Sequence, residues 1–179
     1  MLEIKKVEDD KEKNEIFRYR YQIFVERDKD APKRLYPDGL LKDSCDEDAI
    51  HVGCYETADN SLLGFLTVVI KKNLEFILPI ERQHNICVEP NSAEIMRLII
   101  SDKVDLKLRA LVLNGLLQEV GNIVQENNLK RLYLVTTESA KKIYSKVGFK
   151  QIGPYKLYMG ISNECPMCLD VNEVNRKLV

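Results

Sequence analysis

The chain has 179 residues, of which 45% are hydrophobic and 31% charged, and its formal net charge is −1 at pH 7. This size and balance are typical of one globular domain, which we place over residues 1–179. Basic and acidic residues are mixed along the chain, so its charge predicts neither a nucleic-acid partner nor a membrane-surface role.

Targeting signals are not evident in the sequence. Residues 1–15 lack the apolar core of a secretory signal, and no stretch approaches the ~20 apolar residues of a transmembrane segment. We therefore expect a cytoplasmic protein with no transmembrane segment.

The predicted elements of the first half begin with an edge strand over 2–7. A charged, flexible segment leads to an amphipathic helix over 14–26, where apolar residues recur at helical spacing. The stretch 27–43 is long for a connection without secondary structure, and such loops are often functional. Strands over 49–56 and 62–70 flank a turn-forming stretch and predict a hairpin.

The second half opens with an irregular stretch over 71–92 and a central strand over 93–101. A helix over 106–128 follows, with Asp102 or Asp105 as its cap. The remaining predicted elements are a strand over 131–137, a short helix within 139–148 with Gly148 past its end, strands over 149–153 and 155–161, and a terminal helix over 170–178. This order predicts an α/β (α+β) fold with a mixed sheet and helices on its faces.

Five cysteines are an odd number in a chain of this length, which favours reduced thiols. Cys165 and Cys168 form a CxxC pair, but there is no second such pair, and His51 and His84 are far away in the sequence. We therefore expect no metal site and interpret the pair as two thiols in a loop.

Glu94 and Arg97 lie in an otherwise apolar run, AEIMRLII over 93–100. On a regular strand, residues three apart point to opposite faces, so each needs its own partner unless the strand is bulged. The charged residues available as partners are Arg18, Arg20, Asp43, Asp46, Glu47 and Asp48. Such a cluster either orients an amine and binds a substrate carboxylate, or braces strand and helix as an ion-pair network.

Two further side chains have a structural and a chemical interpretation. His51 in the predicted hairpin is more simply a half-buried, hydrogen-bonded histidine than a catalytic group. Tyr144, before Gly148-Phe149, could donate a proton to a thiolate leaving group or could pack. The spacing alone leaves both alternatives open for Tyr144.

Several motifs resemble known proteins. TESAKKIYSKVGFKQIGPYKLY (137–158) is similar to the closing segment of the GNAT acyltransferase fold. The long-chain N-acyltransferase branch of that fold resembles this chain in its ordered charged motifs and in LPIE (78–81) and IGPYKLYMG (152–160). The matching charged and aromatic positions are Arg20 with Phe24, Asp43 with Asp46, His51 two residues after Ala49, and Glu94 with Arg97.

The resemblance implies a GNAT-like central sheet, mostly antiparallel with a splayed parallel pair and flanked by helices. It implies an N-acyltransferase that moves a fatty acyl group from acyl carrier protein or acyl-CoA to an amino acid or related small-molecule amine. Glu94 would be the base, Arg97 and Arg20 further catalytic residues, and the acceptor side would include Asp43, Asp46, His51 and Phe24. The implied donor-binding residues are Ile99, Ile100, Ser101, Lys103, Arg109 and Tyr144.

The sequence departs from parts of that branch. Autoinducer synthases carry a tryptophan in the loop after the first helix, whereas this chain has none, and Thr67 stands where they carry an arginine. The glycine-rich pyrophosphate loop is also missing from 101–110, which favours phosphopantetheine on an acyl carrier protein over tight coenzyme A binding. No tightly bound cofactor is expected. Lactone synthase, short-chain acetyltransferase and a catalytically silent binding domain remain alternatives.

Overall fold

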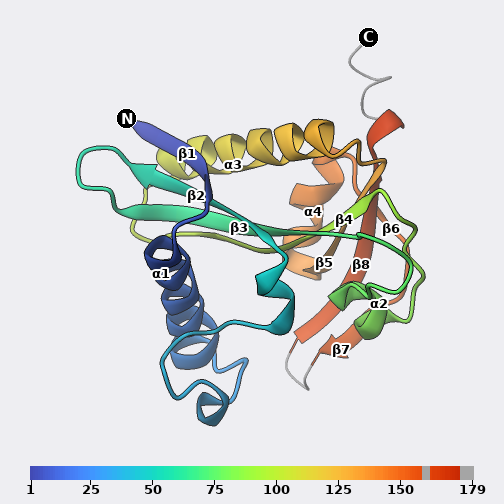
Figure 1. Cartoon of the computed structure of the whole chain (residues 1–179), viewed down its shortest axis with the longest axis horizontal. Helices are drawn as coiled ribbons and strands as arrows, with labels where there is room; N and C mark the ends of the chain where they lie inside the picture. The colour runs from blue at the N-terminus through green and yellow to red at the C-terminus, as the bar shows by residue number, and fades with distance from the viewer. Residues whose placement is uncertain (159–161, 174–179) are drawn as a thin grey trace. The chain divides into compact units, whose positions relative to one another are not determined.

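A computed structural model of the chain describes residues 1–158 and 162–173 (Figure 1). Its sheet follows the order β1-β2-β3-β4-β5-β8-β6, and β7 pairs with β8. The strands are β1 (Leu2–Val7), β2 (Ile50–Glu56), β3 (Leu62–Ile70), β4 (Ser92–Ile100), β5 (Arg131–Thr137), β6 (Lys150–Gln151), β7 (Lys156–Tyr158) and β8 (Ser162–Asp170).

The helices are α1 (Asp10–Arg20), α2 (Pro79–His84), α3 (Leu106–Glu126) and α4 (Glu138–Val147). β4 and β5 are parallel and are joined through α3, with Ser92 opposite Arg131 and Glu94 opposite Tyr133. The pairs β1–β2, β5–β8, β6–β8 and β7–β8 are antiparallel. The predicted α/β class, with a mostly antiparallel sheet and one parallel pair, is therefore confirmed.

The described residues fall into two compact units, and β3, β4 and α3 each contribute to both. The first unit comprises 1–67 and 97–119. One apolar cluster of this unit forms where α1 packs on the strands, and it consists of Val7, Ile16, Phe17, Tyr55, Leu62 and Phe65.

The first helix begins earlier than the sequence predicts. Asp9 caps α1 by accepting hydrogen bonds from the backbone N–H groups of Lys11 and Glu12, at 2.9 and 3.1 Å. The predicted flexible segment is therefore helical. After Arg20 the chain continues as a π-helix, η1 (Tyr21–Arg27). The long stretch that follows contains a short 3₁₀ turn, η2 (Lys33–Leu35).

The second unit comprises 68–96 and 120–173 among the described residues. In it α2 and α4 pack against β5 and β8. α2 was not predicted, because a helix of six residues carries little periodicity within the irregular stretch 71–92. α4 ends as predicted, with Gly148 in the left-handed conformation at φ 114°.

The assignment of Cys165 and Cys168 to a loop is wrong. Both lie in β8, which pairs with β5 from Thr137–Glu164 to Arg131–Asp170. Pro166 obscured this strand in the sequence, since proline is rare inside sheets. All five cysteines are free thiols, as expected. The terminal helix predicted over 170–178 lies largely outside the described residues.

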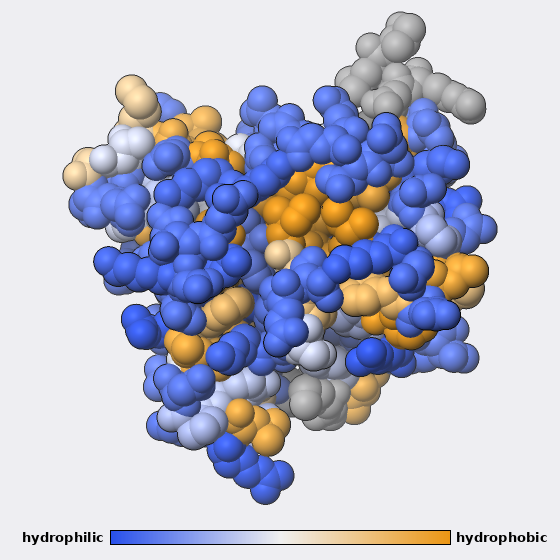
Figure 2. Space-filling model, viewed as in Figure 1, coloured by the Kyte–Doolittle hydropathy of each residue, from blue (hydrophilic) through white to orange (hydrophobic). Residues whose placement is uncertain are grey.

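Figure 2 shows a largely hydrophilic face with apolar side chains gathered in separate areas. None of the helices in the described part of the chain combines the length and the hydropathy of a bilayer-spanning segment.

Candidate active site

β4 carries both residues of the central motif. Arg97 adopts a φ of 53°, the left-handed region that side chains other than glycine rarely occupy. This interrupts the regular alternation that would send Glu94 and Arg97 to opposite faces. A non-glycine residue in this region costs roughly 1 kcal/mol, so contacts made by the Arg97 side chain must offset that cost.

Arg20 is the centre of a buried polar cluster in the first unit. Its side chain is 0% exposed, and Nη1 donates to Oδ1 of Asp46 at 2.8 Å. Nη2 donates to the hydroxyl of Thr67 and lies 3.4 Å from Nδ1 of His51. Burial lowers the pKa of Arg20, and the Asp46 carboxylate counters that effect. A buried charge that binds Asp46 and Thr67 through its two terminal nitrogens ties α1 to η3 and β3.

Asp46 joins this cluster to Arg97. It lies in a 3₁₀ turn, η3 (Ser44–Glu47), where its Oδ2 accepts the backbone N–H of Asp43 at 2.8 Å. Nη1 of Arg97 lies 3.5 Å from the same Oδ2, and Nη2 forms an ion pair with Asp43. The structure thus brings Arg20, Asp43, Asp46 and Arg97 together, and the Arg97 side chain retains 15% exposure.

His51 and Phe24 are placed differently from the sequence interpretation. His51 is fully buried rather than half-buried, with its ring edge-on to Phe17 at 5.4 Å. Burial and the nearby Arg20 lower its pKa to about 4, so the imidazole is neutral. Phe24 packs in η1 against the apolar cluster of Tyr21, Val25 and Leu41. Neither position in itself shows a contact surface for a substrate.

Glu94 is the most unusual titratable group of the second unit. Its residue is 2% exposed, and its Oε2 accepts the backbone N–H of Ile80 at 2.9 Å. Burial raises the pKa of Glu94 to about 8, and the negative charge of Glu81 adds to the effect, while the Ile80 N–H opposes it. No cationic side chain among the described residues pairs with this carboxyl. Such a group exchanges protons near neutral pH.

A second carboxylate, which the sequence reasoning did not select, lies close to Glu94. Glu81 binds Nζ of Lys71 through both oxygens, at 3.0 and 2.8 Å, and both residues are buried. Its oxygens also accept the backbone N–H groups of Leu78 and Val88. The signal was present in LPIE, where proline at the first and glutamate at the third helical position are typical of a helix start.

The residues assigned to donor binding are found in both units. In the first unit the carbonyl of Ser101 accepts Nη2 of Arg109 at 3.1 Å, and the Ser101 hydroxyl accepts the backbone N–H of Lys103. Asp105 caps the adjoining α3 through the backbone N–H of Leu108. Ile99 and Ile100 are half-buried at the end of β4.

Tyr144 belongs to the second unit. Its ring meets Phe149 edge-on at 6.1 Å, and burial raises its pKa. These contacts are those of a packed tyrosine, and they leave its assignment to donor binding a prediction.

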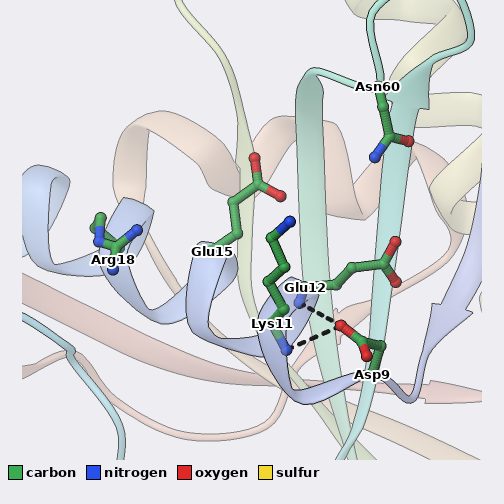
Figure 3. Close-up of a pocket in the computed structure, with 6 residues that line it drawn as sticks. All are labelled: Asp9, Lys11, Glu12, Glu15, Arg18 and Asn60. Carbon is green, nitrogen blue, oxygen red and sulfur yellow. Dashed lines mark hydrogen bonds between the residues drawn. The ribbon is translucent and has the colours of Figure 1, made fainter.

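A pocket of about 410 Å³ lies elsewhere, at the start of α1 (Figure 3). It is lined by Asp9, Lys11, Glu12, Glu15, Arg18 and Asn60, of which only Arg18 was named from the sequence, as a possible partner of the charged motif on β4. Its Asp9 carboxylate is engaged in capping the helix. Within 1–158 and 162–173 no group of three or more His, Cys, Asp or Glu side chains is arranged to hold a metal ion.

Solved structures of several known proteins have a fold similar to that of this chain. No protein family and no curated protein matches the chain by sequence. Among solved structures, the chain is similar to FeeM, an N-acyl amino acid synthase from uncultured soil microbes, with 16% identity and a TM-score of 0.71. That alignment covers 98% of this chain and 94% of FeeM.

Two acyl-homoserine lactone synthases are also similar. LasI shares 20% identity and a TM-score of 0.71, over 95% of this chain and 89% of LasI. BjaI, a CoA-dependent synthase solved with SAM and isopentyl-CoA, shares 18% identity and a TM-score of 0.67, over 93% and 81% of the two chains. The chain therefore has the GNAT-like fold that its sequence predicts, the fold of these acyl-transferring proteins.

Proposed function

We propose that the protein is an N-acyltransferase, which transfers a fatty acyl group from a thioester donor to the amine of an amino acid or related small molecule. One observation carries the proposal: Glu94, buried on β4 and held by the Ile80 N–H, faces no cation among the described residues. Its pKa of about 8 suits a base that takes a proton from an ammonium or an attacking amine. The shared fold with acyl-transferring proteins supports the same activity.

The reaction needs no covalent enzyme intermediate. The amine nitrogen attacks the thioester carbonyl carbon, forming the C–N bond, and the C–S bond breaks to release the carrier thiol. The proton lost by the amine passes to Glu94, directly or through a water, and the thiolate takes up a proton as it leaves. Ionised Glu94 is the competent form, so the Glu94 proton must first be released.

The donor is an acyl thioester carried by the phosphopantetheine of an acyl carrier protein or by coenzyme A. The lack of glycine over 101–110 favours the carrier protein, because a tight pyrophosphate loop needs close backbone approach. The complex of BjaI with SAM and isopentyl-CoA supports a CoA thioester in this fold. Roles for Ser101, Lys103 and Arg109 in holding the donor, a single domain over 1–179 and a cytoplasmic location stay predictions.

Arg20 acts by positioning. Since its side chain is 0% exposed and its two terminal nitrogens bind Asp46 and Thr67, it fixes η3 rather than touching substrate. Arg97 is the partly exposed guanidinium of that group, and a guanidinium matches the carboxylate of an amino acid in shape and charge. The roles of Arg97, Asp43 and Asp46 in acceptor binding stay predictions.

The test supplies the purified protein with a long-chain acyl carrier protein or, separately, the matching acyl-CoA, together with a mixture of amino acids. Mass spectrometry then detects acyl-amides, and heat-denatured protein serves as the control. Acyl-amide formation with release of thiol is the expected result. Intact thioester with every acceptor would overturn the proposal, and a lactone formed only with S-adenosylmethionine would identify a lactone synthase.

A further inference from the structure

Buried charges in the second unit extend beyond Glu94. Lys71 follows β3, and its backbone N–H donates to the carbonyl of Ser92, the first residue of β4, at 2.8 Å. Its Nζ then reaches both oxygens of Glu81 on α2, at 3.0 and 2.8 Å. With side chains 1% and 8% exposed, this pair is too deep to be a solvated surface ion pair.

Glu81 also determines how the first turn of α2 is held. Its Oε2 accepts the backbone N–H of Leu78 at 2.8 Å, and its Oε1 accepts that of Val88 at 3.0 Å. These bonds fix the chain on both sides of the turn that contains Ile80. The Ile80 N–H points at Oε2 of Glu94, so the candidate base is held by a backbone group that Glu81 keeps in place.

We propose that Glu81, anchored by Lys71, is a positioning residue for acyl transfer, which sets both the orientation of Glu94 and the charge that Glu94 faces. This inference rests on the proposed function only for its catalytic meaning. The hydrogen-bonded chain from Lys71 through Glu81 and α2 to Glu94 stands on geometry alone.

The electrostatics of the two carboxyl groups agree with this arrangement. Burial would raise the pKa of Glu81, but the hydrogen bonds from Lys71, Leu78 and Val88 outweigh it and the pKa is lowered. Glu81 is therefore ionised, and its charge adds to burial in raising the pKa of Glu94. Tyr133 is the register partner of Glu94 on β5, and it is neutral because burial raises its pKa to about 12. Environments that separate two carboxyl pKa values in this way assign one group as the proton acceptor.

The test is a ¹³C NMR titration of protein labelled at the glutamate carboxyl carbons, with the Glu94 signal identified by its loss in Glu94→Gln. In Glu81→Gln the Glu94 midpoint should fall by roughly one pH unit, because a neighbouring negative charge is removed. Glu75→Gln, at an exposed loop position of the same unit, is the matched control and should leave the midpoint unchanged.

Glu81→Gln leaves Lys71 as a buried cation without its carboxylate partner, which could prevent folding. The double variant Lys71→Met/Glu81→Gln removes both charges, and the Glu94 midpoint should fall in this variant as well. If neither variant moves the midpoint relative to wild type, the inference is overturned, whatever the loss of stability. A purely structural brace would change the melting temperature without changing this titration.

The titration needs no turnover, so it separates the two proposals. A lowered midpoint in a protein that forms no acyl-amide supports the Glu81 arrangement and contradicts the proposed function. Acyl-amide formation with an unchanged midpoint supports the proposed function and contradicts the Glu81 arrangement. Where turnover is found, the acid limb of the rate against pH should move with the NMR midpoint in Glu81→Gln.

Discussion

The carboxyl of Glu94 accepts a hydrogen bond from the backbone N–H of Ile80, 2.9 Å away, and thereby caps the first turn of α2 from a neighbouring strand. The bond holds the carboxyl in one orientation without giving it a counter-charge. A base that is oriented but not neutralised keeps its affinity for a proton. This combination distinguishes Glu94 from Glu81, whose partner is a lysine.

The first prediction concerns pH and stability. The pKa of Glu94 is raised to about 8 in the folded protein, while an unfolded glutamate titrates near its ordinary 4.5. Between these values the folded state binds more protons than the unfolded state. The stabilisation of the folded state by this proton is therefore present at low pH and is lost as pH rises toward 8. Glu94→Gln keeps the Ile80 bond without the charge. Its stability relative to wild type should therefore increase by several kcal/mol from pH 5 to pH 9.

Denaturant unfolding of both proteins across this range measures the effect. Equal pH dependence in the two proteins would show that Glu94 titrates as an ordinary surface carboxyl.

The second prediction has the opposite sign. Burial and Arg20 lower the pKa of His51 to about 4 in the folded state, against 6.5 for an ordinary histidine. Between these pH values the unfolded state binds a proton at His51 and the folded state does not. Stability should then fall as pH drops from about 6.5 to 4, by up to roughly 3 kcal/mol from this residue. His51→Asn removes that portion, and chemical unfolding of both proteins at pH 7 and pH 4.5 checks it. Parallel losses in the two would contradict a neutral His51.

The third prediction uses the backbone of Arg97. Arg97→Gly and Arg97→Ala both remove the ion pairs with Asp43 and Asp46, but only glycine adopts a φ of 53° without steric cost. The glycine variant should be more stable than the alanine variant by roughly 1 kcal/mol, the reverse of their usual order in a strand. Urea unfolding of the two proteins decides it, and a more stable alanine variant would place Arg97 in ordinary extended backbone.

The fourth prediction concerns the Arg20–Asp46 pair. Arg20→Met leaves a buried carboxylate short of its main partner and should cost about 3–5 kcal/mol. Asp46→Asn in that background should restore part of the lost stability. The loss in the double variant should therefore be smaller than the sum of the losses in the two single variants. The double-mutant cycle should give a coupling of roughly 2 kcal/mol. Additive effects would mean that the two side chains contribute independently.

Much of the fold was accessible from the sequence because its patterns are local. The strands 62–70 and 131–137 have the predicted bounds, and the helix predicted from 106 begins there, capped by Asp105. The elements that were missed depend on partners distant in sequence. α2 takes a cap from Glu94, and β8, with Pro166 inside it, is specified by its pairing with β5.

The candidate site was accessible to a similar extent. The sequence identified the charged residues Arg20, Asp43, Asp46 and Arg97, which the structure brings together. It could not indicate the left-handed conformation of Arg97, since that depends on ion pairs with residues about fifty positions away. Nor could it show that His51 is fully buried, or that Lys71 and Glu81 form a buried ion pair in the unit that contains Glu94.

The most direct measurement compares the wild-type protein with Glu94→Gln in the rate of acyl-amide formation from a long-chain acyl thioester and an amino acid. Glutamine preserves the shape of the side chain and can still accept the Ile80 N–H, so folding should be retained, which circular dichroism and a melting curve verify. We predict that the variant loses roughly 10²-fold or more of the rate, because it cannot take up the amine proton. An unchanged rate in the folded variant would contradict the role of Glu94 as the base.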